Sequence, residues 1–202
     1  CGAAALLEVA HHLRDHPPAR SVALVAAAAH FQGRRGIVEF LDRHARRHPY
    51  YAQRQQQPLS PRLFISLDLS SQTDQLGIWN NTYSFDFKRF FVPLGRRFTA
   101  YAEEVGQELA NGISPIKGMD WSSYMPGGLS PDSEVAFEAG LPSLVLATVN
   151  DARYGVHTTL DLPGQVNFAN LERQVDLLVG LLERASTDPE LFAGMEDLNP
   201  VL

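Results

Sequence analysis

Cysteine is nearly absent from this chain. Cys1 is the only cysteine among 202 residues. An internal disulfide bond is therefore impossible, and so is a metal cluster held by several thiolates. If the chain binds a metal ion, its ligands have to come from imidazole, carboxylate and carbonyl groups.

Lysine and long hydrophobic runs are also scarce. Lys88 and Lys117 are the only lysines among 17 basic residues, which we interpret as a coding bias and which argues against lysine-based catalysis. The net charge is −6 at pH 7 with both signs interspersed, so no basic surface suggests a nucleic-acid partner. The apolar runs at residues 3–10 and 22–29 fall well short of the roughly 20 residues that a membrane span needs.

The chain contains no obvious linker. Its 202 residues are enough for one well-buried domain, and no Gly/Ser-rich or Pro-rich stretch divides the hydrophobic segments. We therefore expect a single domain over residues 1–202. Because the sequence starts at Cys1 and not at methionine, we also expect this domain to be a fragment of a longer chain or a processed product.

Hydrophobic periodicity predicts helices that alternate with strands. Apolar runs of strand length occur at residues 21–28, 62–69, 75–79 and 143–149. Apolar residues at helical spacing occur at residues 3–14, 37–47, 87–109 and 167–185. This order predicts an α/β protein, folded as a three-layer α/β/α sandwich around a mostly parallel central sheet.

Five polar side chains lie next to the predicted strands, where an open α/β sheet places its ligand-binding groups. They are His30, Asp68, Asp132, His157 and Asp161. An imidazole and carboxylates at one sheet edge can bind a divalent metal ion, but zinc catalysis needs at least three protein ligands and an open position. The structural alternatives stay open: His157 as a loop anchor bonded to Asp161 or to the backbone, Asp68 as a cap of loop amides, and His30 as an exposed loop side chain.

Several segments resemble, in order and spacing, the motifs of the M28 family of zinc aminopeptidases and carboxypeptidases. They are CGAAALLEVAHHL from Cys1, AAHFQGRRG from Ala28, SLDL from Ser66, PDSEVAFEAGLP from Pro131, VHTTLD from Val156 and VNFANL from Val166. The corresponding family motifs read approximately GADDNASGVAALLELAR, GEEQGLLGS, NLDM, SDHxPFxxAGIP, YHTxxDT and DFxNL. The likeness spans nearly the whole chain and implies a zinc-exopeptidase-like fold.

The resemblance also implies roles for the candidate residues. In that family two zinc ions are held by Asp, His and Glu side chains, and one glutamate of a Glu-Glu pair acts as general base. Carried over motif by motif, Asp68 and His157 correspond to metal ligands. Asp161 corresponds to the aspartate of the HTxxD motif and Asp132 to that of the SDH motif, where both would support the ligands.

The Glu-Glu pair of the family is replaced here by His30-Phe31. If the site were active, the imidazole of His30 would be the candidate general base, whereas the phenyl ring of Phe31 cannot bind a metal ion. The bridging aspartate and the HxD motif of the family would precede Cys1. The resemblance therefore implies that zinc is possible but that its site is absent or incomplete.

This pattern is similar to that of degenerate family members, which keep the peptidase fold and bind partners. We therefore expect a peptidase-like domain with a degraded metal site, inactive and used for recognition or scaffolding of a protein or peptide partner. The alternative is a zinc-dependent aminopeptidase with an altered site. A weaker likeness of SLDLSSQTD, from Ser66, to the Gaa1-type subunit of the GPI transamidase suggests a role in a membrane-associated complex. The family resemblance also favours an extracytoplasmic location.

Overall fold

The structure is a computed structural model, and it describes residues 1–45, 50, 53, 58–79, 92–111, 132–151, 153, 155 and 158–193. Its helices are α1 (Gly2–Asp15), α2 (Arg35–His44), α4 (Val92–Glu104), α6 (Asp132–Glu138), the short 3₁₀-helix η2 (Pro163–Gln165) and α7 (Phe168–Thr187). Its strands are β1 (Phe64–Asp68), β2 (Leu76–Trp79), β3 (Leu109–Asn111) and β4 (Ser143–Thr148). None of the described helices is long and apolar enough to cross a membrane.

The described strands form one sheet in the order β1-β4-β2-β3. β1 is parallel to β4 and β2 is parallel to β3, whereas β2 and β4 are antiparallel. Every residue of β4 is buried, as expected for an apolar strand that is covered on both faces. β1 lies at the edge of the described sheet and is only half-buried. The prediction of a mostly parallel sheet is confirmed.

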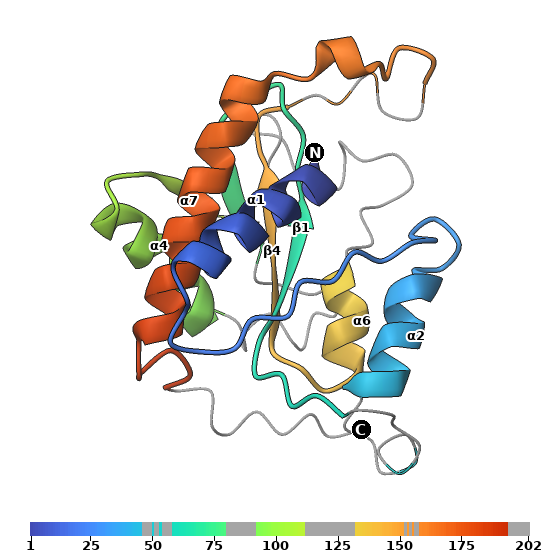
Figure 1. Cartoon of the computed structure of the whole chain (residues 1–202), viewed down its shortest axis with the longest axis vertical. Helices are drawn as coiled ribbons and strands as arrows, with labels where there is room; N and C mark the ends of the chain where they lie inside the picture. Colours follow the sequence, from blue (N-terminus) through green and yellow to red (C-terminus); the bar gives the residue numbers. More distant parts are fainter. Residues whose placement is uncertain are drawn as a thin grey trace.

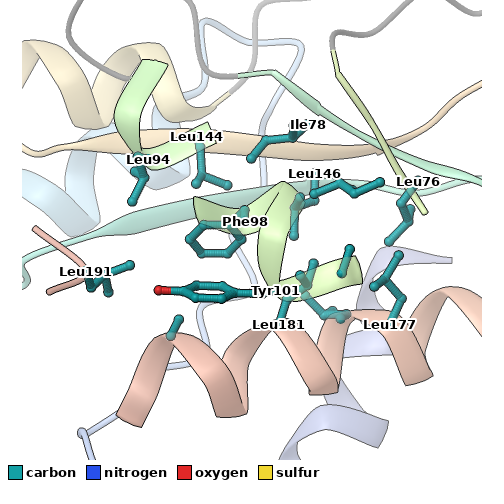
Figure 2. Packing of buried hydrophobic residues seen from close by; sticks show 14 of the residues in the cluster. Leu76, Ile78, Leu94, Phe98, Tyr101, Leu144, Leu146, Leu177, Leu181 and Leu191 are labelled. Carbon is teal, nitrogen blue, oxygen red and sulfur yellow. The ribbon is translucent and has the colours of Figure 1, made fainter. Parts of the chain in front are cut away.

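Helices α1, α4 and α7 cover one face of this sheet (Figure 1). Leu144 and Leu146 of β4 point to this face together, because alternate side chains of a strand point to the same side. Figure 2 shows them in one cluster with Phe98 of α4 and Leu181 of α7. Each of these four side chains is at most 1% exposed, so the main core of the protein lies between the sheet and α7.

Helices α2 and α6 form the layer on the other face (Figure 1). Ile37 and Leu41 of α2 pack with Val135 and Ala136 of α6, and all four are buried. Phe64 of β1, which is partly buried, packs against this second cluster. The two helical layers with the sheet between them confirm the predicted three-layer α/β/α sandwich.

Polar contacts fasten the carboxyl end of α7 to α4. Asp188, the residue that caps α7, accepts hydrogen bonds from the hydroxyl of Tyr101 at 2.5 Å and from Nη1 of Arg97 at 3.1 Å. Arg20 donates to the carbonyl oxygens of Ala185 at 2.5 Å and Asp188 at 2.6 Å. The bond from Tyr101 holds the pKa of the Asp188 carboxyl below its usual range, and burial raises the pKa of the Tyr101 phenol. We call Arg20, Arg97, Tyr101 and Asp188 the α7-end cluster.

The strand predicted at residues 21–28 is wrong. These residues adopt no regular secondary structure, and Val22 and Leu24 are each 39% exposed. Five of the eight positions from Ser21 to Ala28 are serine or alanine, whose side chains bury little apolar surface. The run is therefore apolar in composition, but its side chains are too small to pack it firmly against a neighbouring strand.

The helix predicted at residues 87–109 is shorter in the structure. Residues 87–91 lie outside the described residues, α4 ends at Glu104, and Leu109 belongs to β3. Gly106 has a φ of 73°, and its N–H donates to the carbonyl of Glu103 at 3.0 Å. A glycine in this left-handed conformation ends a helix, so an apolar residue at the next helical position falls into a strand.

Candidate functional site

Asp68 lies at the end of β1, beside the end of β4. The parallel register places Asp68 opposite Ala147, one residue before the end of β4. Nη1 of Arg153 donates to Oδ1 of Asp68 at 2.8 Å, and Nη2 donates to the carbonyl oxygens of Asp68 at 3.0 Å and Thr148 at 3.3 Å. The side chain of Arg153 is 14% exposed and that of Asp68 is 31% exposed. One guanidinium therefore binds the carboxyl ends of both strands.

A sharp turn after β4 brings Arg153 to this position. Asn150 and Arg153 have φ values of 57° and 50°, a left-handed conformation that is uncommon for residues with a Cβ atom. The backbone N–H of Arg153 donates to Oδ1 of Asp151 at 2.8 Å, which stabilises the turn. Strained backbone of this kind tends to persist where the surrounding contacts hold a side chain in a required place.

His30 lies in the loop between residues 28 and 36 and contacts the first residue of α6. Its Nδ1 is 3.1 Å from Oδ1 of Asp132. An ionised carboxylate can only accept a hydrogen bond, so Nδ1 carries the proton in this pair. The two side chains are 42% and 26% exposed, which leaves the pair open to solvent.

The same loop is held to α6 by a second ion pair. Nη1 of Arg34 donates to Oε2 of Glu134 at 2.9 Å. A Cβ atom at Gly36 would lie 2.3 Å from the carbonyl oxygen of Ala28, so the close return of the chain requires glycine at this position. Phe31 is 79% exposed at the tip of the loop. The loop is therefore fixed at its base and presents an aromatic ring to solvent.

A buried polar network joins the loop after β1 to β4 and α7. Gln174 is fully buried, and its Nε2 donates to the carbonyl oxygens of Ser70 at 2.9 Å and Thr73 at 2.6 Å. Its Oε1 accepts a hydrogen bond from the hydroxyl of Thr148 at 3.0 Å. The backbone N–H of Ser70 in turn donates to the Thr148 hydroxyl oxygen at 2.9 Å. These bonds fix the chain immediately after Asp68.

The structure brings the predicted site residues into two separate pairs. Asp68 pairs with Arg153, and His30 pairs with Asp132. Among the described residues, no hydrogen bond or ion pair joins one pair to the other. Asp161 is exposed in a turn, where its N–H donates to the carbonyl of Thr158 at 3.2 Å. The remaining candidate, His157, lies outside the described residues.

Comparison with known proteins identifies the fold. No protein-family model matches the sequence, and no curated protein matches it. Among solved structures, BSAP, a zinc aminopeptidase from Bacillus subtilis, is similar with a TM-score of 0.61 and 16% sequence identity. The chain has an aminopeptidase-type fold. The similar region covers 94% of this chain and 41% of BSAP, so this chain spans less than half the length of that protein.

The described residues, which do not include the candidate ligand His157, do not by themselves form a zinc centre. Within them, no group of three or more His, Cys, Asp and Glu side chains could hold a metal ion. The carboxylate of Asp68 is bound to the guanidinium of Arg153, whose other acceptors are carbonyl oxygens. Protein zinc sites are built from nitrogen, sulfur and carboxylate ligands. The ends of β1 and β4 instead supply oxygen atoms to an organic cation.

Sequence reasoning missed two residues of this region, Arg153 and Gln174. Gln174 left a signal, because it lies three positions after Leu171 within the apolar stripe of α7. A polar residue at a buried helical position has to find partners in the core. Arg153 lies in a loop without periodicity, and its only signal is indirect: a carboxylate that ends an apolar strand needs a cation or hydrogen-bond donors.

Proposed function

We propose that this domain uses its aminopeptidase-type fold to recognise a protein or peptide partner, and that it does not hydrolyse peptide bonds with zinc. The observation that carries the proposal is the ion pair between Asp68 and Arg153. Asp68 is the carboxylate that the family resemblance marks as a metal ligand. The guanidinium of Arg153 donates one hydrogen bond to Oδ1 of Asp68 and two to neighbouring carbonyl oxygens, so it competes with a metal ion for that carboxylate oxygen.

The positions that correspond to the two glutamates support the same proposal. His30 is held by Asp132, and Phe31 extends into solvent, at 79% exposure. Phe31 offers no metal ligand, and the Nδ1 atom of His30 is used in the bond to Asp132. A hydrolytic metallopeptidase needs a metal-bound water and a base beside it. Phe31 can supply neither, and His30 keeps only its Nε2 atom for one of these roles, in place of two glutamate carboxylates.

Exposed apolar side chains offer contacts for a partner. Leu160, Leu162 and Phe168 are 61%, 54% and 73% exposed, and Phe31 is 79% exposed. Leu160 and Leu162 lie just before η2, Phe168 begins α7, and Phe31 lies in the loop before α2. Loops on a rigid scaffold are where binding residues concentrate, and buried aromatic side chains contribute strongly to interfaces.

Zinc binding and peptidase activity test the proposal directly. The chain is purified without chelators, its zinc content is measured, and zinc is titrated while the melting temperature is recorded. We expect far less than one zinc ion per chain, no zinc-dependent rise in melting temperature and no cleavage of aminoacyl nitroanilides. Near-stoichiometric zinc that is lost in Asp68→Ala and retained in the control Asp74→Ala, an exposed aspartate, would overturn it.

Two other functions are outcomes of this test. A zinc-dependent aminopeptidase with an altered site would bind zinc through Asp68 and cleave the reporters, and Asp68→Ala would abolish both properties. A role as a Gaa1-like subunit of a membrane-associated transamidase complex rests on the likeness of residues 66–74 alone. In the structure that segment includes Ser70 and Thr73, whose carbonyl oxygens accept bonds from Gln174, so a structural role accounts for it.

A further inference from the structure

We propose that Arg153 is a built-in cation, held in a site for a small positive ion that the carboxyl ends of β1 and β4 create. The site consists of three oxygen atoms: Oδ1 and the carbonyl oxygen of Asp68, and the carbonyl oxygen of Thr148. Removal of the Arg153 side chain is expected to leave this site intact and able to bind a free guanidinium ion. The inference deepens the proposed function and rests on it in one respect, that no zinc ion displaces Arg153.

The geometry of the three oxygen atoms supports a cation site. All three accept from the same guanidinium at distances between 2.8 and 3.3 Å. Two of them are carbonyl oxygens at the ends of neighbouring parallel strands, so their positions are set by the sheet and not by Arg153. A carboxylate oxygen with two carbonyl oxygens is a donor set that suits hard cations and planar guanidinium groups.

The oxygen atoms stay in place for reasons independent of Arg153. Thr148 donates its hydroxyl to Gln174, and Gln174 also holds the carbonyl of Ser70, two residues after Asp68. These bonds join both strand ends to α7. The strand ends therefore remain fixed when the arginine side chain is removed, and a preformed site binds a replacement ion more readily than a site that has to be assembled.

The backbone around Arg153 places its positive charge on the three oxygen atoms of this site. Its backbone has a φ of 50°, and its N–H is held by Asp151, so the turn after β4 aims the side chain back across the strand ends. At 14% exposure, the guanidinium is largely withdrawn from solvent. The Asp68 carboxylate is only partly exposed, at 31%, so loss of its cation is expected to destabilise the fold when no other ion is bound.

The test compares Arg153→Ala with Arg173→Ala in the full chain. Arg173 also pairs with an aspartate, Asp74, at 2.6 Å, but its side chain is 65% exposed, which makes it a matched surface control. We expect Arg153→Ala to lower the melting temperature by roughly 4–8 °C and Arg173→Ala by less than about 2 °C. Millimolar methylguanidinium, the probe, is expected to restore part of the loss in Arg153→Ala and to leave the parent and Arg173→Ala unchanged.

The double variant Asp68→Asn/Arg153→Ala identifies the atoms involved. It is expected to melt higher than Arg153→Ala, because no partly buried charge is left without a partner, and to show no response to methylguanidinium. Equal losses in Arg153→Ala and Arg173→Ala would overturn the inference, and so would a methylguanidinium response that is absent or the same in all variants.

A second variant covers the case in which Arg153→Ala does not fold. Arg153→Lys keeps a positive charge without the planar fork, so its melting temperature is expected to fall between those of the parent and Asp68→Asn/Arg153→Ala. A lysine variant that fails to fold as well would show that charge is not what the site requires, which contradicts the inference. Zinc bound by the parent protein would overturn the proposed function. A parent without zinc, together with an Arg153→Ala variant that shows no rescue, would overturn only the inference.

Discussion

Two arginine-bound carboxylates occupy different ends of this domain and differ in what surrounds them. Asp188 caps α7 and accepts bonds from Tyr101 and Arg97, both of α4, so it joins two helices of one layer. Asp68 ends a strand, and its partner Arg153 also contacts the neighbouring strand end. The side chains are 21% and 31% exposed, so burial does not separate them.

The comparison shows that an arginine partner alone does not mark a carboxylate as functional. In the α7-end cluster, Arg97 and Tyr101 come from α4, which packs around the main core, and Arg20 comes from the chain that follows α1, so the contacts fix the end of α7. At the end of β1, the partners lie where an α/β sheet presents its ligand-binding groups. A guanidinium also binds carbonyl oxygens at the end of α7, so position in the fold is what distinguishes Asp68 from Asp188.

The largest effect is expected from Gln174→Ala, at the Asp68 end. This change removes three hydrogen bonds of a fully buried side chain and takes the Nε2 donor from the carbonyl oxygens of Ser70 and Thr73. The free energy of unfolding should fall by about 3 kcal/mol. Urea denaturation measures it, with Gln72→Ala, an exposed glutamine, as the control. Equal small losses in both variants would show that the Asp68 end does not depend on this network.

A smaller loss is expected from Asp188→Ala in the α7-end cluster. The change removes the acceptor of both Tyr101 and Arg97, and charged hydrogen bonds of this kind support a loss of about 1–2 kcal/mol in the free energy of unfolding. Tyr101→Phe removes one of the two bonds and should cost less. If Tyr101→Phe were the more harmful change, the hydroxyl of Tyr101 would contribute stability beyond its bond to Asp188.

Acid should weaken the α7-end cluster in a defined direction. The pKa of Asp188 is lower in the folded protein than in an unfolded chain, so its charge contributes stability that is fully present above the unfolded value of about 4. This contribution is lost as the pH falls through the lower, folded pKa. The stability difference between the parent and Asp188→Asn should therefore be constant near neutral pH and shrink in acid. A difference that grew in acid would contradict the sign of the shift.

The smallest effect is expected at the exposed pair of His30 and Asp132. Solvent screens this pair, so Asp132→Asn should change the free energy of unfolding by less than about 1 kcal/mol. Thermal melts of Asp132→Asn and of Arg43→Ala, a change in an exposed pair within α2, should be similar. A loss in Asp132→Asn as large as that in Gln174→Ala would show that the loop before α2 contributes to the core of the Asp68 end.

The parts of the fold that were predictable are those whose evidence is local. The run at 143–149 is bulky and β-branched and became the buried strand β4, and the stripe of 167–185 became α7, which begins after its cap Asn167. The run at 21–28 has the same apolar character but small side chains, and it formed no strand. A run of small apolar residues predicts burial poorly, because the free energy gained on folding depends on the apolar surface area that the side chains bury and not on their residue class.

The candidate site was predictable only in part. Asp68 was placed correctly at the end of a strand, because a lone carboxylate after an apolar run is visible in the sequence. The contact between Asp68 and Arg153 was not predictable, since the two residues are 85 positions apart and meet through a turn with left-handed backbone. The contact between His30 and Asp132 joins residues 102 positions apart and was equally hidden.

The sequence by itself determined the layers of this protein, and it excluded internal disulfide bonds and metal clusters held by several thiolates. Strand and helix periodicities repeat within a few residues, and the scarcity of cysteine holds in any conformation, so neither depends on long-range contacts. Only the tertiary structure decided which cation meets Asp68 and how His30 is held. Those outcomes depend on which loops the sheet brings together, because electrostatic and hydrogen-bond partners are selected by distance in space and not along the chain.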